Sequence, residues 1–184
     1  MRKVLRAILL VLLGYLCQVC IIPYFSIGSI TPNLLFSLIA IATVAYGRFY
    51  TFGIACTAGI LMEVMIGGLP NLYLIAYPAI GQLGSLIFAD KSERKLEQER
   101  SQGKPGTNSD PKLRTLLCVL FDITWFEVVH LVFIYLNGVD IGWTQTFRAL
   151  GSIAYTGLVT ALTLLPIRWL LGMYAKKTNV QAAV

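Results

Sequence analysis

The feature that most constrains this chain is that its charged residues are confined to a few short segments, with long apolar stretches between them. Only 13% of its 184 residues are charged, whereas about 25% is usual for a soluble domain. In the core of a bilayer every backbone N–H and C=O needs a partner within the protein, so only helices and closed barrels cross it. Apolar stretches of these lengths suit helices. The sequence therefore predicts an all-α integral membrane protein.

Turn residues divide the apolar sequence into six stretches, which we interpret as the spans of a single polytopic membrane domain over residues 1–184. The first stretch follows a basic N-terminus. It is too long for the core of a signal peptide and no small-residue cleavage site follows it, so we expect it to be retained. Residues 90–112 are polar and are expected to form a cytoplasmic loop. The six expected spans cover approximately residues 4–22, 32–46, 51–66, 72–89, 113–136 and 147–171.

The basic residues predict the orientation, because cytoplasmic loops of membrane proteins are enriched in Lys and Arg. With the N-terminus inside, Arg48, the basic residues of the polar loop, Lys176 and Lys177 all lie inside. The three outer loops hold no Lys or Arg, although Arg148 follows shortly after one of them. We therefore expect both termini in the cytoplasm. The formal net charge of +6 then suits contact with anionic membrane lipid rather than nucleic acid.

Small residues at four-residue spacing predict where helices approach each other closely, because small side chains let two backbones come together in lipid. Three stretches carry such a pair. We expect one helix contact at each, and no ligand is implied. The pairs are Ala55 with Gly59, Gly81 with Ser85, and Gly157 with Ala161.

The segment Ile30–Leu38 combines a polar Thr-Pro-Asn step with the start of an apolar run. We expect Thr31 to cap a helix and Pro32 to take its first position, where a missing N–H costs nothing. Asn33 then brings an amide to the membrane, where an unpaired polar group is costly. Pro32 and Asn33 are therefore candidates for interhelical or partner contacts. The plainer alternative is a helix cap and nothing more.

Ionisable residues within the expected spans need a physical explanation, because a charge in the bilayer is costly. Glu63 lies in the third span, whereas Asp122, Glu127 and His130 share one broad face of the fifth. They are candidates for a proton or cation relay or a polar cavity. The alternative, which we favour, is that they make interhelical contacts. By depth in the membrane, Arg148 is a suitable partner for Glu63.

The residue types that catalysis or metal binding needs do not occur in suitable arrangements. His130 is the single histidine, so no His-Glu-x-x-His zinc motif is present. The sequence also lacks a Gly-rich phosphate loop and a nucleophile elbow. We therefore expect a protein that is not an enzyme and that holds no metal or cofactor.

Two sequence patterns resemble those of the rod-shape-determining membrane protein family MreD of bacteria. The first is Thr31-Pro32-Asn33-Leu34-Leu35, which follows a Pro-Tyr-Phe turn. The second runs from Gly59 through Glu63 to Gly67 and is similar to the family pattern Gly-Leu-Leu-x-Asp-x-x-x-Gly, with Glu63 in place of the usual Asp. The resemblance covers roughly residues 1–90. Beyond them only the size and the number of spans agree.

The resemblance implies a non-enzymatic scaffold subunit of the cell-elongation machinery in the bacterial cytoplasmic membrane, which helps to organise peptidoglycan synthesis. Its implied partners are an MreC-type periplasmic scaffold, an MreB-type bacterial actin, a lipid-linked glycosyltransferase and a class B transpeptidase. The family fold is similar to the six-helix substrate-binding component of energy-coupling-factor transporters. The alternative function is therefore a vitamin-binding subunit of such a transporter.

The orientation can be tested by labelling single cysteines from outside the cell. We expect cysteines at Gly67, Gly68 and Asn137 to be labelled in intact cells, because these positions lie in outer loops that lack basic residues. A cysteine at Ser109 is expected to react only after the membrane is permeabilised. External labelling of Ser109→Cys would contradict both the orientation and the family resemblance.

Overall fold

The computed structural model describes residues 2–27, 30–66, 71–89, 97–99, 101–103 and 110–170. These residues are helical apart from turns, short connections and one isolated antiparallel bridge between Ile27 and Ile30. The prediction of an all-α fold is therefore confirmed for this part of the chain. The expected turn at residues 67–70, most of the 90–112 loop and the basic C-terminal residues lie outside it.

The observed helices match the six expected stretches, and their ends differ by only a few residues. The first stretch changes from an α-helix to a π-helical turn and then to a 3-10 turn before it ends. The elements are α1 (Arg2–Leu16), η1 (Cys17–Ile21), η2 (Ile22–Phe25), α2 (Leu34–Tyr46), α3 (Arg48–Ile66), α4 (Leu72–Phe88), α6 (Pro111–Leu136) and α7 (Trp143–Leu170).

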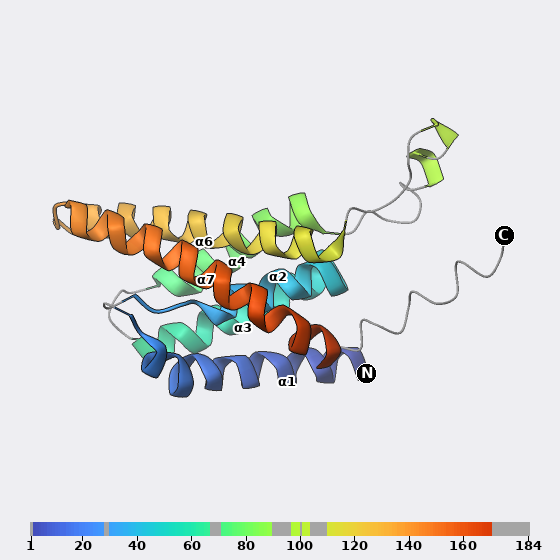
Figure 1. Cartoon of the computed structure of the whole chain (residues 1–184), viewed down its shortest axis with the longest axis horizontal. Helices are drawn as coiled ribbons and strands as arrows, with labels where there is room; N and C mark the ends of the chain where they lie inside the picture. Colours follow the sequence, from blue (N-terminus) through green and yellow to red (C-terminus); the bar gives the residue numbers. More distant parts are fainter. Residues whose placement is uncertain are drawn as a thin grey trace.

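Helix α2 forms the centre of the bundle (Figure 1). Every residue from Leu34 to Val44 is buried, and α2 contacts α1, α3, α4, α6 and α7. A helix that is apolar on all sides is typical of a position shielded from water on every side. Its 13 residues correspond to a length of roughly 20 Å at 1.5 Å per residue. The surrounding helices α6 and α7, with 26 and 28 residues, extend beyond it.

The outward faces of the surrounding helices are apolar, which indicates contact with lipid. Soluble monomers rarely expose large continuous apolar surfaces. Three segments of the described chain are long and apolar enough to cross a membrane: Ile8–Phe25, Pro111–Leu136 and Trp143–Leu164. Together these observations indicate a membrane protein. The exposed apolar side chains include Ile8, Leu9, Leu12, Leu13, Leu16, Val128, Val132, Leu150, Leu158 and Leu162.

Small residues mediate the contact between α3 and α4, and the prediction that Ala55, Gly59 and Gly81 mark helix contacts is confirmed. A methyl group added at Gly59 would lie 2.7 Å from the carbonyl oxygen of Tyr73, and one added at Gly81 would lie 3.1 Å from the Cβ of Ala55. For the pair on α7, Gly157 and Ala161, the prediction is correct for one residue only. Gly157 packs against Leu120 of α6, whereas Ala161 is exposed. A four-residue spacing spans slightly more than one helical turn, so a partner that crosses at an angle can contact one member of a pair and miss the other.

Two glycines of α3 provide a matched test of this packing. We expect Gly59→Ala to lower the free energy of unfolding by about 1–3 kcal/mol, because the added methyl group would collide with the α4 backbone. Gly53→Ala is the control, because no atom lies within 4 Å of its added methyl group. Alanine is also the better helix former by about 1 kcal/mol. Thermal unfolding of both variants in detergent measures the difference, and equal stabilities would contradict the packing.

Candidate functional site: a polar cavity at the start of the central helix

The Thr-Pro-Asn segment lies at the start of α2, but it does not form the helix cap that the sequence predicted. The helix begins at Leu34, two residues later than expected, and Asn33 occupies the cap position with extended backbone angles (φ −101°, ψ 92°). The roles expected of Thr31 as cap and Pro32 as first helical residue are therefore wrong. The physical reason is that side chains from other helices bind the backbone of this segment and hold it extended.

The side-chain amide of Gln18 pairs with the backbone on both sides of Asn33. The N–H of Leu34 donates to Gln18 Oε1 at 2.7 Å, and Gln18 Nε2 donates to the carbonyl oxygen of Pro32 at 3.2 Å. Gln18 belongs to the π-helical turn η1, which inserts an extra residue into a helical path. The Gln18 amide therefore supplies both hydrogen bonds that a neighbouring peptide group would otherwise make with the backbone entering α2.

Asn33 connects α2 to two further helices. Its backbone N–H donates to Thr156 Oγ1 of α7 at 3.0 Å, and its side-chain Nδ2 donates to the Tyr77 hydroxyl of α4 at 2.8 Å. The prediction that Asn33 has an interhelical partner is therefore confirmed. With Gln18, these contacts bring the end of the first helical path, α4 and α7 together at the start of the central helix.

Aromatic rings form a continuous layer beneath this polar segment. The rings of Phe36 and Tyr77 are stacked with centroids 4.5 Å apart, and Phe126 of α6 lies 5.1 Å from Phe36. Phe126 also stacks on the imidazole of His130 at 5.9 Å and lies 6.0 Å from Tyr73. These contacts fix the side chains that separate the apolar core from the polar groups beyond it.

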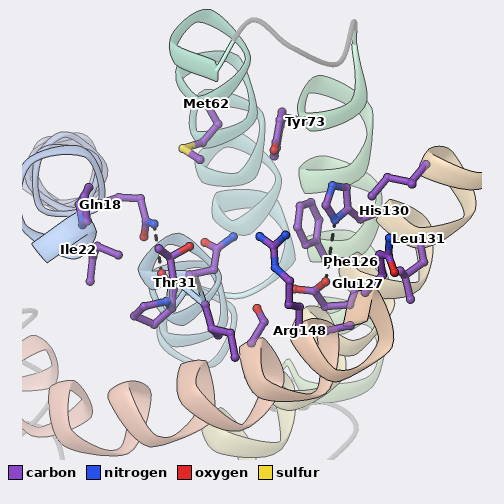
Figure 2. A pocket seen from close by; sticks show the side chains of 18 of the residues that line it. Gln18, Ile22, Thr31, Met62, Tyr73, Phe126, Glu127, His130, Leu131 and Arg148 are labelled. Atoms are coloured by element: carbon purple, nitrogen blue, oxygen red, sulfur yellow. Dashed lines mark hydrogen bonds and ion pairs between the residues drawn. The ribbon is translucent and has the colours of Figure 1, made fainter. Parts of the chain in front are cut away.

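A cavity of about 470 Å³ lies beyond the start of α2, bordered by the end of the first helical path, α3, α4, α6 and α7 (Figure 2). It exists because the central helix begins well inside the bundle, so that the end at which α6 and α7 are joined has no helix at its centre. Five of the seven residues that the sequence marked as candidates line it: Pro32, Asn33, Glu127, His130 and Arg148.

The cavity contains side chains of both charges. Glu127 and His130 lie on one face of α6, with His130 Nδ1 4.0 Å from Glu127 Oε2. Arg148 reaches into the cavity from α7 and faces them (Figure 2). Apolar side chains such as Ile22, Met62 and Leu131 surround these groups. Such a mixed lining suits binding of a molecule with polar and apolar parts.

Glu63 is placed outside the cavity lining and binds the start of α4. Its carboxylate accepts hydrogen bonds from the backbone N–H groups of Asn71 at 2.8 Å, Tyr73 at 3.0 Å and Leu74 at 3.4 Å. A carboxylate at a helix N-terminus satisfies N–H groups that have no partner within the helix, and it is favoured by the helix dipole. Helix capping thus accounts for the position of the Glu63 carboxylate, and the pairing with Arg148 that depth in the membrane suggested stays a prediction.

Asp122 is also separate from the cavity, although it shares α6 with Glu127 and His130. It is fully buried against α4, where a side chain at Gly84 would collide with its carboxylate. The thiol of Cys118 donates to Asp122 Oδ2 at 3.6 Å. The expectation that Asp122 shares one polar group with Glu127 and His130 is therefore wrong. The broad face that holds all three is divided between α4 and the cavity.

Comparisons with protein-family models, with curated proteins and with solved structures found no match. The groups that sequence reasoning left without a role are Tyr77 and Thr156, whereas Gln18 was expected only to add an amide within the first span. Their roles depend on contacts among α2, α4 and α7, and no local sequence pattern predicts which helices contact each other.

Substitution of Gln18 tests whether this amide holds the start of α2. We expect Gln18→Leu to leave the Pro32 carbonyl and the Leu34 N–H without their partner, at a cost of about 1–3 kcal/mol for each buried group. Gln18→Glu has nearly the same shape and retains the acceptor for Leu34, but it places a second oxygen against the Pro32 carbonyl, so it should also lose stability. Thermal unfolding in detergent measures both. Wild-type stability of Gln18→Leu would show that the amide has no such role.

Proposed function

We propose that this chain is a six-span protein of the bacterial cytoplasmic membrane with both termini in the cytoplasm. The described helices support this proposal, because each runs along the bundle in the direction opposite to the one before it (Figure 1). The start of α1, the turn at Gly47 and the start of α6 therefore lie at one end. The basic residues follow the same division, since Arg48 lies at that end and the outer loops contain no Lys or Arg.

We infer that the protein acts as a non-enzymatic scaffold of the bacterial cell-elongation machinery. The observation that carries this inference is the position of the two sequence patterns that resemble the MreD family. The Thr31–Leu35 pattern lies where the central helix is bound by three other elements. In the second pattern, Gly59 contacts the α4 backbone and Glu63 binds the start of α4. Both patterns thus serve a definite structural purpose, which supports a shared fold rather than a chance likeness of apolar letters.

In this role the protein would recruit its partners through its lipid-facing, outer and cytoplasmic surfaces. The partners proposed by resemblance are an MreC-type periplasmic scaffold, an MreB-type bacterial actin, a lipid-linked glycosyltransferase and a class B transpeptidase. Apolar side chains exposed on the surrounding helices, such as those of α1 and α7, provide surface for contacts with other spans. Association in lipid relies on close packing and polar contacts rather than on burial of apolar surface.

A second candidate function is a small-molecule-binding subunit of an energy-coupling-factor transporter. The observation that favours it is the cavity of about 470 Å³, which falls within the range of roughly 300–1,000 Å³ usual for small-ligand sites. The two functions predict different companions after gentle purification. A scaffold is expected to retain a protein partner, whereas a transporter subunit is expected to retain a stoichiometric vitamin.

Crosslinked co-purification from native membranes tests the scaffold proposal. We expect the tagged protein to recover a single-span periplasmic protein, and no vitamin-like molecule in stoichiometric amount. Asn33→Leu should remain inserted, because an interhelical polar contact in a membrane contributes only about 0.6 kcal/mol on average. We expect this variant to recover less of the partner. Asn137→Leu is the matched control, because Asn137 lies at the same end of the bundle and its side chain bonds only to its own helix.

The two functions are separated by the mass of what co-purifies. A bound vitamin without a protein partner would replace the scaffold proposal with the transporter subunit. Equal partner recovery by Asn33→Leu and Asn137→Leu would restrict the Thr31–Leu35 pattern to a role in folding.

A further inference from the structure

The outer cavity is the place in this bundle where a charged molecule can meet charged side chains. Glu127 of α6 and Arg148 of α7 both line it, together with His130. In Figure 2 the Arg148 side chain extends into the centre of the cavity, and Glu127 and His130 face it from the neighbouring helix. The formal charges of Arg148 and Glu127 are opposite and cancel.

This balance of charge constrains the ligand. In surroundings of low dielectric constant a charge without a partner costs several kcal/mol, whereas opposite charges in contact offset much of that cost. A purely anionic ligand would bind Arg148 and repel Glu127, and a purely cationic ligand would do the reverse. A ligand that carries both charges can contact both side chains and leave the cavity neutral.

The remaining lining indicates a ligand with apolar parts beside its charges. Ile22, Ile30, Leu131 and Ile134 contribute aliphatic surface, and Met62 and Met65 add flexible apolar side chains. The cavity lies beyond the first residue of α2, toward the end of the bundle that holds the α6–α7 turn. Its volume of about 470 Å³ exceeds that of a small head group and leaves room for the atoms that follow it.

We propose that this cavity binds the head group of a zwitterionic phospholipid, with the phosphate at Arg148 and the primary ammonium at Glu127. Arg suits phosphate because its guanidinium donates two parallel hydrogen bonds to a pair of oxygens. The glycerol and the first methylene groups then contact the aliphatic side chains. A free phosphoethanolamine compound carries the same charged groups, and the experiment separates these two sources. The proposal goes beyond the scaffold function and does not depend on any protein partner.

The test uses the purified full-length chain, delipidated in detergent and titrated with phosphatidylethanolamine or phosphatidylglycerol of identical acyl chains. We expect wild type to bind phosphatidylethanolamine about tenfold more tightly, which corresponds to about 1.4 kcal/mol. Glu127→Gln should abolish or invert this preference, because a cavity that retains Arg148 and lacks the carboxylate favours the anionic lipid. Arg148→Gln should weaken binding of both lipids about tenfold. Native mass spectrometry of the bound lipid measures each ratio.

Matched controls remove the same charges outside the cavity. Asp140→Asn removes an exposed carboxylate at the same end of the bundle, and Arg48→Gln removes a basic residue at the opposite end. Both should keep the wild-type preference. Arg148→Lys retains the positive charge and should keep the preference with weaker binding, so it replaces Arg148→Gln if that variant fails to fold.

The outcomes distinguish the sources and the proposals. Competition by soluble glycerophosphoethanolamine at concentrations equal to the lipid would show that the free head group is sufficient and would overturn the lipid assignment. Equal binding of both lipids by wild type, or a preference that Glu127→Gln leaves unchanged, would overturn the zwitterion proposal. Loss of the protein partner with the lipid preference intact would reject the scaffold function alone.

Discussion

The start of α2 is the point on which the rest of the bundle depends, because extended backbone there must find hydrogen-bond partners without water. Pro32 and Asn33 lie before the helix, and the N–H of Leu34, its first residue, has no acceptor within it. The side chains of Gln18 and Thr156 therefore bind their backbone groups, and Tyr77 binds the Asn33 amide. Any movement of the end of the first helical path, of α4 or of α7 breaks one of these bonds, so the four elements are held in one arrangement.

The cavity is a consequence of this arrangement. A central helix that ran the full length of α6 and α7 would fill this end of the bundle with its own side chains. Instead the chain enters extended, and the aromatic layer of Phe36, Tyr77 and Phe126 closes the core beneath it. The space beyond is lined by residues from the surrounding helices, and the polar groups of α6 and α7 can face it without entering the apolar core.

Much of this fold could be predicted from the sequence, because each helix is marked locally by an apolar run between turn residues. The close approach of a helix at Gly59 could also be predicted, since small residues mark such contacts, but the pattern does not identify α4 as the partner. The start of α2 could not, because the N-cap pattern of Thr31 and Pro32 is local and the bonds from Gln18 and Thr156 are not. The π-helical turn that contains Gln18 has no sequence signal that we could use. The sequence also predicted one polar group containing Asp122 and Glu127. Helical angles show that both side chains point to the same broad face of α6, but they do not show that α4 covers one part of this face and the cavity another.

The carboxylates of the expected spans show why a buried charge alone does not define a site. Glu63 is matched by three backbone N–H groups, and Asp122 is enclosed at Gly84 beside Cys118. Both are surrounded by groups of the protein itself, so a ligand would have to displace those groups. Glu127 instead borders an open volume together with Arg148, where a ligand can contact it without breaking the fold. Glu127 and Arg148 are therefore distinguished from the other charged residues by lining a cavity that a ligand can enter, and not by their charge alone.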